Sequence, residues 1–271
     1  MKNIKYYAYP SSVKDALAML LNKKYKAMAL AGGTLAAKTL PDAVETCLDL
    51  KNLPIKGIKS RGGNLVIGAG ATFDEIDRSE LCRSWAGGSI SKAAAACSSQ
   101  LIRNMATIGG NIARPHSFNI FPVVLLGLDA KVRLQTKKGA KLVDLQYLYS
   151  SDLGLCPGLD SLITEILIPA KTRRWKCEFI KLAKTASSWE SYIMLFFSAG
   201  KRGKAVTQAR VAVGALSPRP FRAPEAEKAM LSGDGASAVA KAFAVELEAV
   251  GAGEYRSSAA SSLLKRFIIK R

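Results

Sequence analysis

Two pairs of adjacent glycines, each next to a threonine, are the residues of this chain best suited to bind a ligand. One pair lies in Gly32-Gly33-Thr34 and the other in Thr107-Ile108-Gly109-Gly110-Asn111. Neighbouring glycines allow backbone N–H groups to converge on one point without a Cβ in the way. A concave run of such donors binds anions, and phosphate is the usual one. One Gly-Gly pair most often marks a simple turn, whereas two such loops predict a group with two phosphates held between them.

Other chemically useful side chains are few. His116 is the single histidine, and we expect it in a surface loop. With one histidine, neither Ser-His-Asp catalysis nor a multi-histidine metal site is expected. The five cysteines form no C-x-x-C pair, which argues against a disulfide framework, a zinc site or an iron–sulfur cluster. We expect them to be small buried residues, so redox chemistry would need a bound cofactor.

The composition favours a soluble protein with an anionic partner. The chain has 271 residues, 49% of them hydrophobic, and a net charge of +19. No apolar run reaches the roughly 18 residues that span a bilayer, and the N-terminus lacks the apolar segment of a secretory signal, so a cytoplasmic protein is expected. The charge favours nucleic acid, a dinucleotide or an acidic subunit. Nucleic acid is the least expected, because the basic residues are spread out and no nucleic-acid-binding signature accompanies them.

The expected secondary structure places both glycine loops at the ends of regular elements. A helix is predicted to begin after Ser12, and short buried strands are predicted at 27–30 and 46–50. The first loop then follows the carboxyl end of a strand, where α/β proteins usually bind ligands. A single alanine-rich helix over 89–102 is predicted to lead into the second loop.

A third glycine motif, Gly68-Ala69-Gly70, follows an apolar strand and looks like the start of a dinucleotide-binding fingerprint. The third glycine of that fingerprint is missing, because Phe73 occupies its position. Thr72 and Glu75 have instead the spacing of a capping box. We therefore interpret this motif as a turn from a strand into a helix and not as a ligand site.

The rest of the chain predicts a second domain. A polar and basic segment at 170–175 is the predicted domain boundary. Before it we expect a helix at 123–128 and strands at 131–135 and 162–168. Beyond it we expect strands of an antiparallel sheet at 178–182 and 207–216, and helices at 236–250 and 259–269.

Several short motifs occur in an order that belongs to a known family. The most specific is Thr107-Ile108-Gly109-Gly110-Asn111 after Ile102-Arg103-Asn104, and further matches lie at 30–34, 125–130, 168–169, 179–182, 211–215, 222–226 and 254–256. Over nearly its whole length the chain resembles the FAD-binding medium subunits of the molybdenum hydroxylases, of xanthine dehydrogenase and carbon monoxide dehydrogenase type. The resemblance implies an α+β fold. A two-lobed, p-cresol-methylhydroxylase-like FAD-binding domain would cover 1–170, with lobes of about 1–55 and 56–170, and a smaller α+β domain, an antiparallel sheet with helices, would cover 171–271.

The same resemblance implies that both glycine loops wrap the diphosphate of FAD, which agrees with the anion-binding interpretation. Ile163 matches a residue that contacts the cofactor through its strand backbone, Lys181 a lysine at the flavin, and Trp189 an aromatic residue near the isoalloxazine ring. No catalytic residue and no metal ligand is expected. The implied cofactor-binding residues are Leu30, Ala31, Gly32, Gly33, Thr34, Leu35, Thr107, Ile108, Gly109, Gly110, Asn111, Asn119, Ile163, Lys181 and Trp189.

Two positions depart from the family pattern. Leu35 stands where the first loop commonly continues with aspartate, and Asn119 is the nearest match to a family aspartate that lies one residue further on. An amide in place of a carboxylate keeps hydrogen-bonding capacity and loses a charge. We therefore expect FAD affinity or flavin potential to differ from the family pattern.

The family resemblance implies electron transfer between subunits. Electrons would pass from the iron–sulfur clusters of a small subunit to FAD and then to a soluble acceptor such as NAD, a quinone or oxygen. Substrate would be hydroxylated on a large subunit that carries the molybdenum cofactor. Two alternatives stay open: a stand-alone flavin oxidoreductase of the same fold, and a basic scaffold or nucleic-acid-binding protein with a decayed flavin site.

Overall fold

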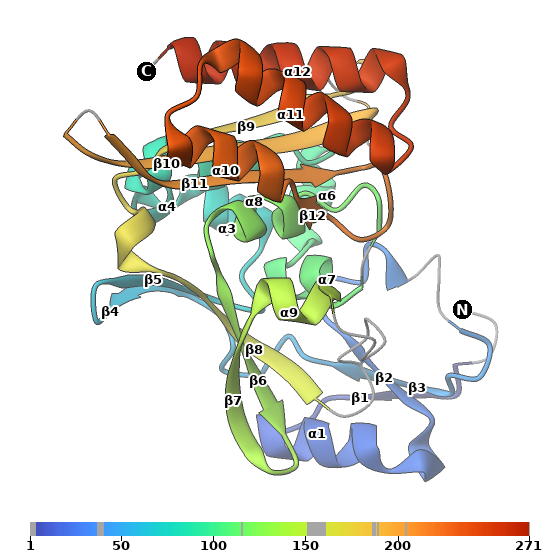
Figure 1. Ribbon diagram of the computed structural model, residues 1–271. Coiled ribbons are helices and arrows are strands. Elements are labelled where there is room, and N and C mark those ends of the chain that lie inside the picture. Colours follow the sequence, from blue (N-terminus) through green and yellow to red (C-terminus); the bar gives the residue numbers. More distant parts are fainter. Residues whose placement is uncertain are drawn as a thin grey trace.

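The computed structural model describes residues 4–36, 41–114, 116–150, 161–185, 188, 190–203 and 205–270. Their buried hydrophobic side chains gather in three clusters. A small parallel sheet lies at one end, a five-stranded sheet with short helices in the middle, and a four-stranded sheet under α10, α11 and α12 at the other end (Figure 1). This arrangement confirms the predicted α+β fold of two lobes followed by a smaller domain.

The first lobe is a parallel sheet with one helix packed on it. The predicted helix is confirmed: its N-cap is Ser12, whose Oγ accepts the N–H of Asp15 at 3.0 Å. On its inner face Leu17 and Leu20 pack with Leu48 of the central strand. The elements are β1 (Tyr6–Ala8), α1 (Val13–Leu21), the 3-10 turn η1 (Lys23–Tyr25), β2 (Ala27–Leu30) and β3 (Thr46–Asp49), with the strand order β1-β3-β2.

The second lobe contains the five-stranded antiparallel sheet, with the order β4-β5-β8-β6-β7. Val132 and Leu134 alternate with exposed residues and bury the inner face, as the sequence pattern predicts. The strands are β4 (Ile58–Arg61), β5 (Asn64–Gly68), β6 (Lys131–Thr136), β7 (Gly139–Asp144) and β8 (Ser161–Ile168). The helices are α3 (Phe73–Arg78), α4 (Glu80–Ser84), η2 (Ala86–Gly88), α5 (Ser89–Ala95), α6 (Gln100–Met105), α7 (Ile108–Ala113), α8 (Phe121–Gly127) and α9 (Leu145–Ser150).

The prediction of one helix over 89–102 is wrong, because α5 ends at Ala95. Ser98 has a φ of +40°, which no helix accommodates, and the Oγ of Ser99 caps α6 by accepting the N–H of Ile102 at 3.4 Å. Serine hydroxyls bind nearby backbone groups and therefore favour helix starts over helix interiors. The guanidinium of Arg103 donates to the carbonyls of Cys97 and Ser98 and so closes the turn.

The C-terminal sheet is packed on both faces. Its central strand β10 turns Leu195 and Phe197 toward the C-terminal helices and Phe196 toward the core of the second lobe. Phe196 lies so close to α8 that a Cβ on Gly127 would be 2.1 Å from its ring. The elements are η3 (Ala170–Thr172), β9 (Lys176–Leu182), β10 (Ile193–Arg202), β11 (Ala205–Gly214), β12 (Phe221–Arg222), α10 (Pro224–Ser232), α11 (Ala236–Ala249) and α12 (Glu254–Ile269), with the strand order β12-β11-β10-β9.

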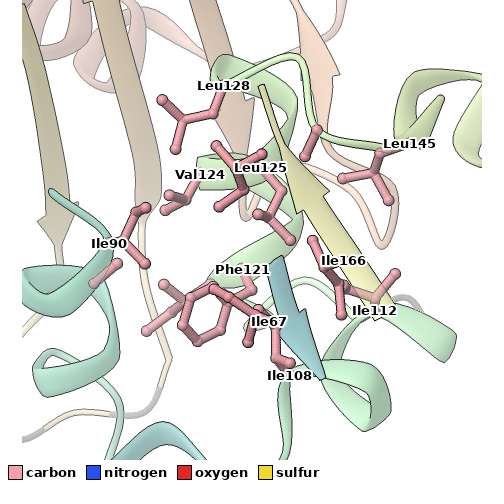
Figure 2. Packing of buried hydrophobic residues seen from close by; sticks show 14 of the residues in the cluster. Ile67, Ile90, Ile108, Ile112, Phe121, Val124, Leu125, Leu128, Leu145 and Ile166 are labelled. Carbon is pink, nitrogen blue, oxygen red and sulfur yellow. The ribbon is translucent and has the colours of Figure 1, made fainter. Parts of the chain in front are cut away.

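The core of the second lobe is formed where helices meet the inner face of the five-stranded sheet. Phe121, Val124 and Leu125 of α8 approach Ile67 and Ile166 from the sheet (Figure 2). All five side chains are fully buried. Burying a side chain of this size contributes about 1.5–3 kcal/mol, so α8 is held firmly at the centre of the molecule.

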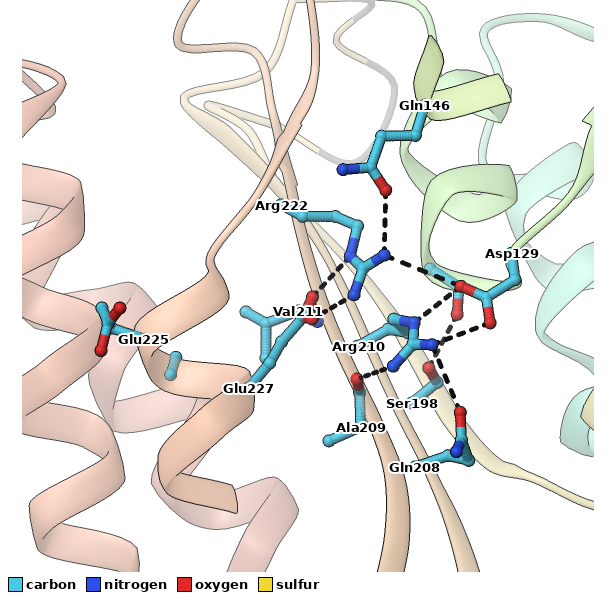
Figure 3. Close-up of polar contacts among 12 residues, drawn as sticks. Asp129, Gln146, Ser198, Gln208, Ala209, Arg210, Val211, Arg222, Glu225 and Glu227 are labelled. Carbon is cyan, nitrogen blue, oxygen red and sulfur yellow. Dashed lines mark hydrogen bonds and ion pairs between the residues drawn. The ribbon is translucent and has the colours of Figure 1, made fainter. Parts of the chain in front are cut away.

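A polar cluster joins the end of α8 to the C-terminal sheet. Asp129, with 17% of its side chain exposed, accepts hydrogen bonds from Arg210 at 2.6 and 3.0 Å and from Lys171 at 2.7 Å. Arg222 lies 3.8 Å from the same carboxylate and also pairs with Glu227 (Figure 3). Burial alone would raise the pKa of Asp129, but the hydrogen bonds from Arg210 and Lys171 outweigh burial and lower it.

We expect Asp129→Asn to lower the free energy of unfolding by about 2 kcal/mol at pH 7, because two cations lose a charged partner. Asparagine tolerates the left-handed backbone at this position, where φ is +50°, so the effect reports the lost charge. The lowered pKa means that the contribution is present above the ordinary carboxyl pKa of about 4 and fades as the pH falls through the folded-state pKa. Urea unfolding from pH 7 down to pH 3 measures it.

Asp144→Asn provides the control, because its ion pair with Lys131 involves a carboxylate that is 62% exposed. Such surface pairs contribute about 0–1 kcal/mol. Equal losses of stability in the two variants would contradict a structural role of the Asp129 cluster.

Candidate functional site

The first glycine loop leaves β2 at its carboxyl end and has open backbone donors. Ala31, Gly32, Gly33 and Thr34 are half-buried and turn directly after Leu30. Within the described part of the chain, none of these four N–H groups makes a hydrogen bond. Gly33 has a φ of +68°, the left-handed region that glycine adopts without strain. The loop therefore offers a row of unsatisfied donors of the kind that binds phosphate oxygens.

The two glycine loops meet directly. A Cβ built on Gly32 would lie 1.8 Å from the carbonyl oxygen of Met105 and 3.2 Å from the Cα of Ala106. Ala106 immediately precedes the second loop. The backbone contact, which only glycine permits, thus brings the donors of the first lobe against the segment of the second lobe that leads into α7.

The second loop is held by the segment between β5 and α3. The N–H of Ile108 donates to the carbonyl of Ala71 at 3.0 Å, and that of Gly109 to the carbonyl of Ala69 at 2.8 Å. A Cβ on Gly109 would be 2.7 Å from Ala69, so this glycine is needed for packing. Gly110 is exposed, and its N–H donates to the Oγ of the N-cap, Thr107, at 3.2 Å.

These contacts refine the expectation of two equivalent donor loops. The N–H groups of the second loop are bonded within the chain, whereas those of the first loop are open. The Gly68-Ala69-Gly70 motif, interpreted from sequence as a turn, is such a turn, and Thr72 and Glu75 form the predicted capping box. Its carbonyls also hold the second loop, a role that its sequence pattern did not indicate.

Asn111 and Asn119 form a closed polar unit beside the second loop. The Nδ2 of Asn119 donates to the carbonyls of Asn111 at 2.8 Å and Arg114 at 2.6 Å, and its Oδ1 accepts from the Nδ2 of Asn111 at 3.1 Å. The Oδ1 of Asn111 accepts the N–H of Phe121 at the start of α8. Asn119 is only 3% exposed. The unit therefore needs an amide at 119, since a carboxylate cannot donate to two carbonyls.

The other predicted contacts lie on separate elements. Ile163 is 8% exposed on β8. Lys181, on β9, donates to the carbonyls of Ala96 at 3.2 Å and Ser188 at 2.6 Å, and burial lowers its pKa while nearby Cys97 opposes that shift. Leu35 directly follows the donors of the first loop. Trp189 lies outside the described residues, so its predicted place near the flavin stays a prediction.

Cysteine and histidine chemistry plays no visible part in this site. Cys82 is buried and Cys97 partly so, and burial raises the pKa of each thiol to about 11. His116 stacks on Phe118 with ring centroids 3.7 Å apart, and burial, together with Arg114, lowers its pKa. Among the described residues no group of His, Cys, Asp or Glu could hold a metal ion. No helix in the described ranges is long and apolar enough to cross a membrane.

The fold and the meeting of two glycine loops, one with open donors, define a nucleotide-binding protein of the flavoprotein type. Residues 2–171 match the family described as FAD binding domain in molybdopterin dehydrogenase, and residues 191–270 match the CO dehydrogenase flavoprotein C-terminal domain. The chain belongs to this family of FAD-binding subunits of molybdenum hydroxylases. FAD is its cofactor, and the chain is an oxidoreductase subunit.

Similar proteins cover almost the whole chain. The nicotine 6-hydroxylase medium subunit of Paenarthrobacter nicotinovorans is 25% identical over 97% of this chain and 96% of its own length. The carbon monoxide dehydrogenase medium chain of Afipia carboxidovorans is 27% identical over 97% and 94%. A crystal structure of the Cu,Mo-CO dehydrogenase superimposes with a TM-score of 0.84 at 25% identity, covering 97% of this chain and 96% of that one.

We expect Asn119→Asp to lower the free energy of unfolding by about 2 kcal/mol at neutral pH, because a carboxylate would face the carbonyls of Asn111 and Arg114 without donating to them. Protonation of the new carboxyl restores one donor, so the loss should shrink as the pH falls toward 4. Thermal unfolding between pH 4 and pH 8 measures both effects.

Asn104→Asp is the matched control, because the Oδ1 of Asn104 only accepts a hydrogen bond, from Gln100 at 2.7 Å. A carboxylate can do the same, and we expect a change within about 0.5 kcal/mol. An Asn119→Asp variant as stable as the wild type would show that the amide is not needed.

Proposed function

We propose that this chain is the electron-transfer subunit of a heteromeric molybdenum hydroxylase. It would receive electrons from an iron–sulfur small subunit and pass them to an external acceptor, with the substrate bound on a separate large subunit. The observation that carries the proposal is the row of open donors at Ala31–Thr34, set against the Met105–Ala106 backbone. The relatives named above are a medium subunit and a medium chain, which supports a place among other chains.

The residues of this chain would bind and orient the cofactor. The first loop would donate backbone hydrogen bonds to the diphosphate, which matches the fit of an anion to unsatisfied N–H groups. Thr107–Asn111 would close the other side, with Gly110 leaving room for a close approach. FAD, when bound, supplies the ring that exchanges electrons one at a time with clusters and in pairs with organic acceptors. We further propose the division at 170, because the two family matches fall on either side of it.

Purification of the chain with an affinity tag, from cells that express it with its neighbours, tests this function. We expect two further chains to copurify, with molybdenum, iron and about one FAD per copy of this chain. Metal analysis and extraction of the flavin give these ratios. A flavin-loaded chain that oxidises a substrate without partners would favour the stand-alone alternative, and a chain free of flavin that binds DNA with steep salt dependence would favour the basic scaffold.

Gly32→Ala is expected to remove FAD while most of the fold persists, since its Cβ would collide with the carbonyl of Met105 and push the loops apart. We predict less than about a tenth of the wild-type FAD per chain, which corresponds to a loss of at least 1.4 kcal/mol in binding. The absorbance near 450 nm and chromatography of the extracted nucleotide measure it.

Gly235→Ala is the control, because a Cβ there meets nothing within 4 Å and the backbone φ is −61°. Far-UV circular dichroism checks that both variants are folded. Full FAD content in folded Gly32→Ala would disprove the role of the loop contact.

A further inference from the structure

A pocket of about 360 Å³ lies between the loop after α7, the connection from β9 to β10 and the first turn of α12. This volume is at the lower end of the range for small-molecule sites and suits one half of a dinucleotide. The pocket adjoins the predicted flavin environment, because Ser188 on its wall accepts a hydrogen bond from Lys181.

Two cations in the pocket have no protein partner. The guanidinium of Arg256 is half-buried, and within the described ranges it makes no hydrogen bond or ion pair. The half-buried Arg210 and Arg222 elsewhere in this domain are, by contrast, both paired with carboxylates. Lys184 lines the same pocket and is likewise unpaired in the described structure. An unpaired guanidinium that is partly withdrawn from water favours an anion, and its planar fork matches phosphate.

The remaining lining residues suit the other parts of a nucleotide. His116 stacked on Phe118, and Tyr192, 43% exposed, present ring surfaces on which a planar base can stack. Glu190 supplies a carboxylate, the group that binds a ribose diol in NAD sites and repels a 2′-phosphate. The Oγ of Ser191 is buried without a protein partner and can bond a ligand.

We propose that this pocket binds the electron acceptor, and that the acceptor is a nicotinamide nucleotide without a 2′-phosphate. The proposal rests on the proposed function, because it needs flavin nearby. An uncharged quinone or oxygen would leave Arg256 and Lys184 without a counter-charge. The transfer is balanced: reduced FAD gives a hydride to NAD⁺, forming NADH and oxidised FAD, and one proton is released.

Calorimetric titration of the FAD-loaded chain with ADP-ribose, which cannot accept electrons, tests binding apart from activity. We expect Arg256→Gln to weaken ADP-ribose binding at least about tenfold, as expected for the loss of a charged hydrogen-bonding partner of phosphate. FAD per chain should stay unchanged. Arg266→Gln is the matched control, because it removes an exposed arginine from the same helix.

Stopped-flow reduction of the bound flavin by NADH and by NADPH adds a second readout. Arg256→Gln should raise the half-saturating concentration of NADH, and Glu190→Gln should improve NADPH relative to NADH. Equal ADP-ribose binding by wild type and Arg256→Gln would overturn the proposal, as would loss of FAD from Arg256→Gln, which would make the pocket part of the cofactor site. A yellow wild-type chain that binds no ADP-ribose would overturn the acceptor and leave the proposed function standing. A wild-type chain without FAD would instead remove the proposed function.

Discussion

The contact between Gly32 and the carbonyl of Met105 sets the geometry on which the site depends. The two lobes have separate hydrophobic clusters, so packing alone does not bring the glycine loops together. A backbone-to-backbone approach does, and any side chain at 32 would prevent it. The first loop can then leave its N–H groups open, because its position is fixed by contact and not by hydrogen bonds of its own. Rigid placement without internal pairing is what a preformed anion site requires.

Elements with a clear period or cap could be predicted from the sequence. Helix α1, strands β2, β6 and β8 and the capping box at Thr72 were all expected. The strand β10 was not, because its residues are buried on both faces and the apolar run has no alternation to mark it. The break between α5 and α6 was missed because the alanine-rich pattern outweighed the serines at 98 and 99, which stop the helix.

The candidate site shows the same division between local and long-range information. The glycine pairs identify the loops, since their chemistry is local. What each glycine does depends on partners far along the chain: Gly109 packs on Ala69, and Gly32 on Met105. Asn119 is the clearest case. Its mismatch with the family aspartate looks like a lost charge in the sequence, whereas in the structure its amide holds two carbonyls of the loop that returns to α8.

The C-terminal domain must keep a fixed relation to the cofactor loops, because the two domains share a core. Phe196 of β10 belongs to the core of the second lobe, while its neighbours Leu195 and Phe197 belong to the helical layer. Rotating the domain would pull Phe196 away from Gly127 and expose it, at a cost of about 1.5–3 kcal/mol for that side chain alone. The Asp129 cluster adds charged contacts across the same boundary. Lys181 and Arg256 are both carried by this domain, so packing and not a hinge fixes their places relative to α8.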